Sequence, residues 1–167
     1  MSKLLQLHDF GQSTWLNYMR RAFIQSGELR QCIADGIQGI TANAAVFQDT
    51  IAHHTDYDQA IHQEIVNGTP YNSIHNALMV DDVQRAADIL HPVFESSQGL
   101  DGFASLELNP SLAHHAVETA ATAGHILARI DRGNAMVEIP ATQAGCEAIR
   151  SLSMEQRMTV CNMSIEA

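Results

Sequence analysis

Two acidic residues lie within otherwise apolar segments of this 167-residue sequence. Glu138 is in the middle of MVEIPAT (136–142), and Glu107 is in GFASLEL (102–108). A buried carboxylate is costly unless it is paired, neutralised or used in a reaction. Two carboxyl groups on neighbouring strands resist being charged together, so we expect this pair to share a proton. Such a pair can work as general acid and base, or it can hold a hard cation with the help of Asn43.

Further polar residues lie near the ends of the predicted strands. Successive side chains of a strand alternate between its two faces. Alternation therefore puts these residues together on one face: Thr41 with Asn43, Ser105 with Glu107, Met136 with Glu138, and Asn162 with Ser164. Barrel enzymes place their chemistry at the carboxyl ends of the strands. We predict one polar ring there, made of Asn17, Asn43, Glu107, Glu138 and Ser164.

Short strand-like segments alternate with helical patterns along the chain, which indicates βαβ units around a parallel sheet. The predicted strands are 13–17, 39–43, 102–108, 135–139 and 160–165. The predicted helices are 26–35, 55–68, 80–96, 110–130 and 143–153, and Pro92 should kink the third helix or end it early. A complete (β/α)₈ barrel has eight strands. We therefore predict a single α/β domain over residues 1–167, a truncated TIM-type barrel of about five parallel strands.

Composition excludes several classes of function. The formal net charge is −10, which argues against nucleic acid and against anionic membrane surfaces as partners. Three widely spaced cysteines without a CxxC motif suit reduced thiols in the cytoplasm. We find no signal peptide and no apolar run near the roughly 20 residues of a membrane span. His54, Asp58 and His62 are spaced four residues apart, with His53 beside them, as in a metal cluster on a helix. A helix that begins at Thr55 would exclude His54, so we assign no metal site.

Several separate segments together resemble one known family. They are LLQLHDFGQSTWLNYMRR, SGELRQCIADGIQGITANAAVF, TDYDQAI, DDVQRAADILHPVFE, DGFASLELNPSLAHH and AMVEIPAT. In this order and at this spacing they look like the first half of bacterial transaldolases of the longer type, and the resemblance covers nearly the whole chain. It implies strands one to five of a transaldolase barrel.

The resemblance also implies a lysine on the fourth strand, in a segment like MIKIPAT, which forms a Schiff base with a keto sugar phosphate. Glu138 stands at that position, and the one lysine of the chain is Lys3. Schiff-base chemistry requires a primary amine with a lowered pKa. We therefore predict that this protein is not a working transaldolase.

The remaining positions that the resemblance implies are partly kept. Glu107 matches the glutamate of the third strand, and Asn43 matches the asparagine of the second. Asn17 replaces an aspartate, and Ser164 replaces a threonine. The family's phosphate-binding region belongs to later strands. We assign Glu138 and Glu107 as catalytic, and we assign substrate binding to Asn17, Thr41, Asn43, Ser105, Thr142 and Ser164.

Two main hypotheses of function follow. The first is an enzyme that uses carboxylate acid–base chemistry, as a lyase, isomerase or cyclase, on a small polar or carbonyl metabolite without a cofactor. The second is an inactive transaldolase-like protein that serves as a binding or scaffold partner. A cation site and sugar binding without chemistry are further alternatives. Open sheet edges invite pairing, so we expect a homo-oligomer, most simply a dimer that completes the barrel, although a different protein could supply the missing strands.

Overall fold

The computed structural model describes residues 2–42, 44–153 and 160–162. Its centre is a parallel sheet with strand order β1-β2-β3-β4-β5, so each strand neighbours the next one along the chain. The strands are β1 (Trp15–Leu16), β2 (Gly39–Ala42), β3 (Phe103–Glu107), β4 (Ala135–Ile139) and β5 (Val160–Asn162). All five predicted strands are present, and β1 and β3 are shorter than predicted. The last residues of the predicted strands 39–43 and 160–165 lie outside the described residues. The α/β class and the partial TIM-type barrel are thus confirmed.

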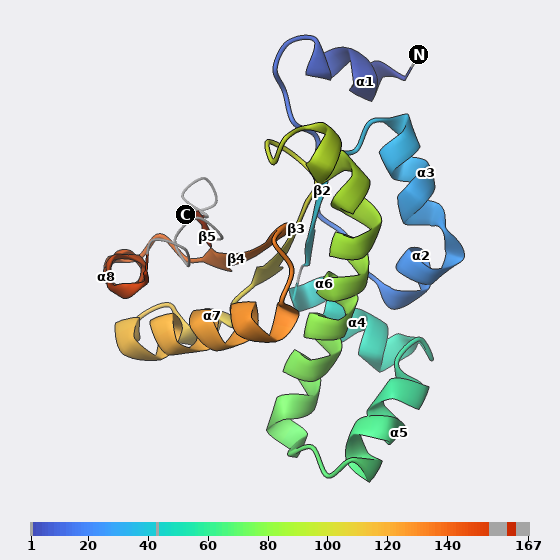
Figure 1. Cartoon of the computed structure of the whole chain (residues 1–167). Coiled ribbons are helices and arrows are strands. Elements are labelled where there is room, and N and C mark those ends of the chain that lie inside the picture. The colour runs from blue at the N-terminus through green and yellow to red at the C-terminus, as the bar shows by residue number, and fades with distance from the viewer. Residues whose placement is uncertain (1, 43, 154–159, 163–167) are drawn as a thin grey trace.

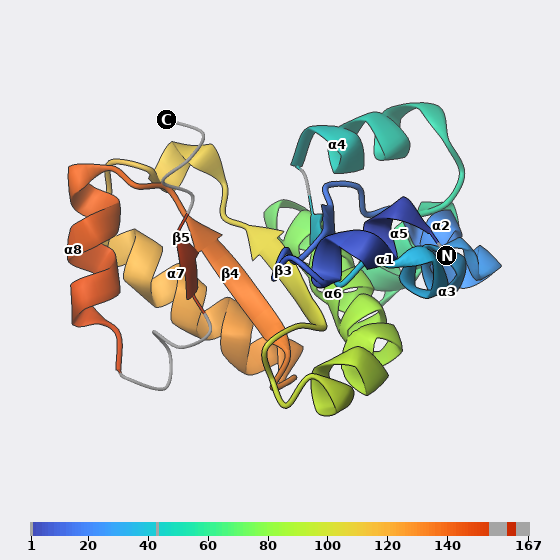
Figure 2. The same ribbon diagram turned by 90° about the horizontal axis from the view of Figure 1, so that it is seen from above.

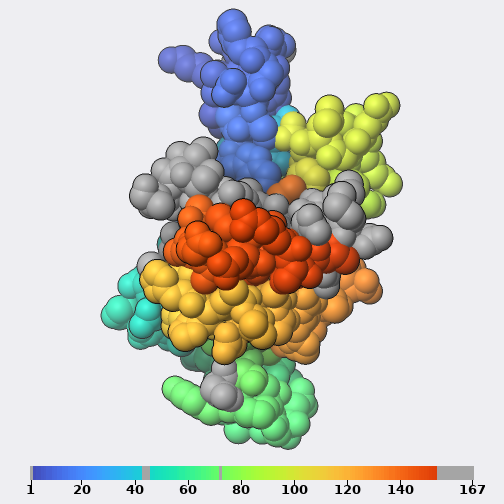
Figure 3. All heavy atoms as spheres, turned by 90° about the vertical axis from the view of Figure 1, so that its left-hand side faces the viewer, coloured from blue at the N-terminus to red at the C-terminus, as the bar shows by residue number. Residues whose placement is uncertain are grey.

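The helices are α1 (Lys3–His8), α2 (Arg21–Ser26), α3 (Glu28–Asp35), α4 (Ala44–His53), α5 (Asp58–Val66), α6 (Tyr71–Ser96), α7 (Ala116–Ile130) and α8 (Gln143–Ser151), with a short 3₁₀ turn at Pro110–Leu112. The main helix contacts with the sheet are those of α6 and α7, on one of its faces. Figure 2 shows α6 beside β2 and β3, and α7 beside β4. Figure 3 shows α8 and α7 as adjacent layers on one side of the molecule.

The sheet face that meets these helices is apolar. Ile40, Leu106, Val137 and Ile139 are buried there, and Ala104 and Ala135 leave room for the helices. Removal of this area from water stabilises the fold by roughly 25 cal/mol per Å² of apolar surface. Because the strands alternate, the opposite face carries the polar residues.

Helix boundaries differ from the predictions in several places. The helix predicted over 26–35 corresponds to α3, and Gly27, with a φ of 91°, separates it from α2. The helices α1, α2 and α4 were not predicted, and α6 begins nine residues earlier than expected. Of the two alternatives for Pro92, early termination of the helix is wrong, since α6 continues to Ser96, and a kink stays a prediction.

The last turns of α6 are held by a close contact with the start of β3. A Cβ atom on Gly102 would overlap the backbone of Phe94, and the Phe94 and Phe103 rings meet edge to face at 5.2 Å. Pro92 removes one helical hydrogen bond. Because this contact lies beyond Pro92, we infer that it stabilises the final turn of the helix.

Gly145 permits a similar close contact at the start of α8. A Cβ atom on it would overlap the carbonyl oxygen of Pro140, just after β4. We expect Gly145→Ala to lower the free energy of unfolding by about 1–3 kcal/mol, because backbone must move to admit the methyl group. Urea denaturation measures the loss. Gly133→Ala is the matched control, since its methyl group meets nothing within 4 Å, and an equal effect of the two substitutions would contradict the expectation.

Candidate active site

The face of the sheet away from the helices carries a cluster around Glu138. Strand register aligns Thr41 with Ser105, Ser105 with Met136, and Glu107 with Glu138. Neighbouring strands lie roughly 5 Å apart, so these side chains form rows on a common face. We call the residues of β2 to β4 on this face the inner face: Gly39, Thr41, Phe103, Ser105, Glu107, Met136 and Glu138. The predicted shared faces of Ser105 with Glu107 and of Met136 with Glu138 are confirmed, whereas the predicted pairing of Thr41 with Asn43 involves a residue outside the described ones.

Two hydroxyl groups hold Glu138. The Thr41 and Ser105 hydroxyls both donate hydrogen bonds to Oε1 of Glu138. Ser105 is fully buried, and Glu138 has only 8% of its surface exposed. These two hydrogen bonds fix the position of the Glu138 carboxyl group on the inner face. The sequence predicted that Thr41, Ser105 and Glu138 lie near one another, but it did not predict these bonds.

Trp15 bounds the inner face on the side of β1. It aligns with Gly39, and a Cβ atom on Gly39 would overlap the Trp15 ring. The indole therefore lies directly against the backbone of β2, which explains the glycine. The sequence analysis did not include Trp15 among the site residues. Once the strand register is known, a tryptophan opposite a glycine on the neighbouring strand indicates that the indole packs on that strand.

Glu107 borders a cavity at the carboxyl end of β3. The cavity has a volume of about 730 Å³ and lies between the end of β3, α6 and α7. Its polar walls include Asn76, His75, Asn109 and Thr122. This volume is in the range of small-molecule sites. Glu107 thus belongs both to the row of Glu138 and to the wall of a cavity large enough for a small metabolite.

The other predicted site residues have different outcomes. Asn17 follows β1 directly and is exposed to solvent. Asn43 and Ser164 lie outside the described residues, so their place in the ring stays a prediction. Within the part of the chain that the structure describes, no three His, Cys, Asp or Glu side chains gather into a potential metal site.

Thr142 is engaged in the fold. Its Oγ1 accepts a hydrogen bond from the Gly145 N–H at 3.0 Å, which caps α8, and it donates to the carbonyl oxygen of Ala113. We leave Thr142 out of the proposed substrate contacts for this reason. We expect Thr142→Val to lower the free energy of unfolding by about 0.5–2 kcal/mol, and Thr142→Ser to change it little. Equal losses in thermal melts of the two variants would contradict a capping role.

The one lysine lies far from this cluster along the sheet. Lys3 is exposed on α1, and α1 packs against the turn that precedes β2: His8 Nε2 is 2.9 Å from the Gly36 carbonyl oxygen. Figure 1 shows α1 and α4 at opposite ends of β2. Glu138 lies in the carboxyl half of β4, so the amine and the candidate site are at different ends of the parallel strands.

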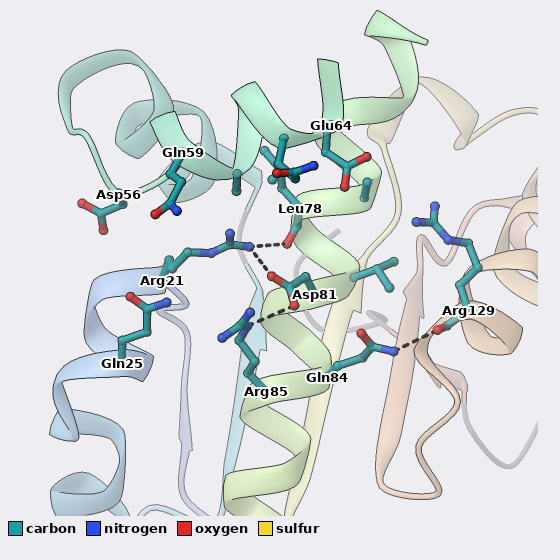
Figure 4. Close-up of a pocket in the computed structure, with 14 residues that line it drawn as sticks. Arg21, Gln25, Asp56, Gln59, Glu64, Leu78, Asp81, Gln84, Arg85 and Arg129 are labelled. Carbon is teal, nitrogen blue, oxygen red and sulfur yellow. Dashed lines mark hydrogen bonds and ion pairs between the residues drawn. The ribbon is translucent and has the colours of Figure 1, made fainter. Parts of the chain in front are cut away.

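A second cavity, of about 660 Å³, lies outside the sheet among α2, α5, α6 and α7 (Figure 4). Four of the charged residues that line it, Arg21, Asp56, Asp81 and Arg85, belong to ion pairs. Arg21 is buried, and its Nε donates to Asp82 at 2.7 Å while its Nη2 lies 2.8 Å from Asp81. Asp81 also pairs with Arg85 at 3.0 Å. These charges satisfy one another, so the cavity has the character of a structural network between helices.

The family model for transaldolase/fructose-6-phosphate aldolase matches residues 14–163, which is most of the chain. The chain belongs to this family. It is 38% identical to transaldolase 2 of Nostoc sp. over 156 residues, which are 93% of this chain and 41% of that relative. It is 37% identical to transaldolase 1 of Streptomyces avermitilis over 150 residues, which are 89% of this chain and 40% of that relative.

The transaldolase-family match thus covers a partial barrel. The chain spans about two fifths of the length of these curated relatives, consistent with their N-terminal portion. Within the described ranges, no helix is long and apolar enough to span a lipid bilayer. Family membership confirms the resemblance found in the sequence.

Proposed function

We propose that this transaldolase-family protein is an enzyme that moves protons with carboxylates in place of forming a Schiff base. The observation that carries the proposal is the Thr41–Ser105–Glu138 cluster. A degenerate position would not need two hydroxyl donors aimed at one carboxylate oxygen on a nearly buried side chain. Fixed donors orient the carboxylate and lower the cost of arranging it during a reaction.

The proposed step is proton removal from a carbon next to a carbonyl group. Glu138 takes the proton, and the electron pair of the broken C–H bond moves toward the carbonyl group, which gives an enediol when that carbon carries a hydroxyl. Glu107, in the same row, gives a proton to the carbonyl oxygen, and the reverse steps return a proton to carbon. Lyase, isomerase and cyclisation reactions of small hydroxy carbonyl compounds share this step. Small-molecule binding on the inner face, beside Glu138 and Glu107, is part of the proposal.

Deuterium exchange tests this step without knowledge of the true substrate. The protein is incubated in D₂O with dihydroxyacetone or glyceraldehyde, and proton NMR follows loss of the signal from hydrogens next to the carbonyl. We expect exchange faster than in buffer alone. Exchange at the buffer rate for both compounds would contradict the proposal and favour a binding or scaffold role.

We also propose that two copies associate. Within the described residues, β1 and β5 are the edge strands of the sheet, and unpaired strand edges invite association. The simplest arrangement is a two-fold dimer. We expect light scattering over a concentration series to give twice the mass of the chain. A mass that stays at one chain throughout would contradict this expectation.

A further inference from the structure

The cavity of about 730 Å³ at the end of β3 has an apolar floor on the helix side of the sheet. Four buried side chains form this floor: Met79 on α6, Leu106 and Leu108 at the end of β3, and Ile126 on α7. Leu106 faces the helices, whereas its neighbour Glu107 belongs to the inner face. The floor of the cavity and the inner face therefore lie on opposite sides of β3.

The rim of this cavity is polar. Six of the described residues that line it have side chains that form hydrogen bonds without a formal charge at neutral pH: Gln48, His75, Asn76, Asn109, Ser111 and Thr122. Glu107 is the one acidic residue in this described lining, which includes neither Lys nor Arg. The side chains of Gln48, His75 and Asn76 are exposed, so a ligand can replace the water that hydrates them.

One wall of the cavity is held in place by hydrogen bonds. This wall is the 3₁₀ turn Pro110–Leu112, which follows β3. Asn109 Oδ1 accepts a hydrogen bond from the Ser111 N–H at 2.9 Å and so caps the turn. Thr119 Oγ1 donates to the carbonyl oxygen of Leu112 at 2.8 Å and ties the turn to α7. A wall that is already ordered loses little conformational entropy when a ligand binds.

We propose that this cavity binds an uncharged small molecule that has an apolar body and a carboxamide or hydroxyl head group. The body covers the apolar floor and removes it from water. The head group lies at the rim, where side-chain amides donate and accept hydrogen bonds. A carboxylate or phosphate ligand finds no cationic side chain in the described lining, so the loss of its hydration is not compensated. This site does not depend on the chemistry proposed for Glu138.

A matched pair of probes tests the class of ligand. 3-Phenylpropanamide and 3-phenylpropanoate share one apolar body, and only the second is charged at pH 7. NMR of protein labelled with ¹³C in its methionine methyl groups follows binding, and Met79→Leu identifies the signal of Met79 on the floor. The titrations are made in moderate salt, which screens the charge of the rest of the chain.

We expect 3-phenylpropanamide to shift the Met79 signal until it saturates, because its ring lies near this methyl group. Its Kd should be at least about tenfold lower than that of 3-phenylpropanoate, as expected when a charged group is desolvated without a partner. A Met79 signal that the amide leaves unchanged, or equal Kd values for the two compounds, would overturn the proposal.

A substitution that fills the cavity tests where the probe binds. Thr122→Phe puts a ring into the cavity from α7 and should abolish binding of 3-phenylpropanamide. Ala121→Phe, at the preceding exposed position and outside the lining, should keep the wild-type Kd. Asn76→Phe fills the cavity from α6 if Thr122→Phe does not fold. Wild-type affinity in the variant with the filled cavity, or loss of binding in Ala121→Phe, would overturn the proposal.

Discussion

Replacing Glu138 by glutamine should slow deuterium exchange of hydroxy carbonyl compounds by about 10²–10⁴-fold, the usual contribution of a positioned general base. Glutamine has nearly the same shape, and its side-chain oxygen can still accept the hydrogen bonds from Thr41 and Ser105. It cannot take a proton at neutral pH. The loss therefore reports on the proton acceptor with little change in packing.

The control is the same substitution at Glu147, which is exposed on α8 and accepts a hydrogen bond from Gln143 at 2.9 Å. We expect Glu147→Gln to exchange at the wild-type rate. Circular dichroism checks that both variants are folded. Exchange within a factor of about three of wild type in Glu138→Gln would exclude this residue as the base, since a general base contributes about 10²-fold or more.

The second large effect concerns stability. Asp82→Ala should lower the free energy of unfolding by about 3–5 kcal/mol, because it removes the buried carboxylate that pairs with the buried Arg21 guanidinium. Asp82 is 1% exposed, accepts hydrogen bonds from Arg21 at 2.7 Å and from the Tyr57 hydroxyl at 2.6 Å, and lies on α6. Burial raises the pKa of Asp82, against the lowering effect of the Arg21 guanidinium.

A neighbouring aspartate provides the matched control. Asp81 also pairs with Arg21, but its side chain is 39% exposed. We expect Asp81→Ala to cost less than about 1 kcal/mol, as exposed ion pairs do. Urea denaturation compares the two variants, with the same dependence of the unfolding free energy on urea concentration used for both. Asp82→Asn, which keeps the size of the side chain, serves if Asp82→Ala is too unstable to purify. An equal loss of unfolding free energy at the two positions would contradict the expectation that the buried Asp82 matters more to stability than the exposed Asp81.

The sheet was predictable because each strand carries local signals. Glycine, aspartate and asparagine flank most of the apolar runs, and alternation correctly grouped Ser105 with Glu107 and Met136 with Glu138. The contact of Thr41 and Ser105 with Glu138 depends on the register of three strands. A slip of one residue would move each side chain to the other face, and no local pattern fixes that register.

The helical layer was less predictable for a similar reason. Arg21 and Asp82 are 61 positions apart. Charged side chains on helices usually face solvent, so the sequence around each of them predicts exposure. Their burial arises only when α2 packs on α6. The continuation of α6 beyond Pro92 likewise depends on the contact of Phe94 with Gly102, which joins two segments only after folding.

Blocking the amines of the chain tests most directly whether its chemistry is carboxylate-based. Lys3 and the amino terminus carry the only primary amines in this sequence, and reductive methylation converts both to tertiary amines, which cannot form a Schiff base with a neutral carbonyl substrate. Mass spectrometry confirms complete modification, and deuterium exchange is then measured as before. We predict the same exchange rate as in the unmodified protein. Loss of exchange on methylation would show that an amine does the chemistry and would contradict the central role of Glu138.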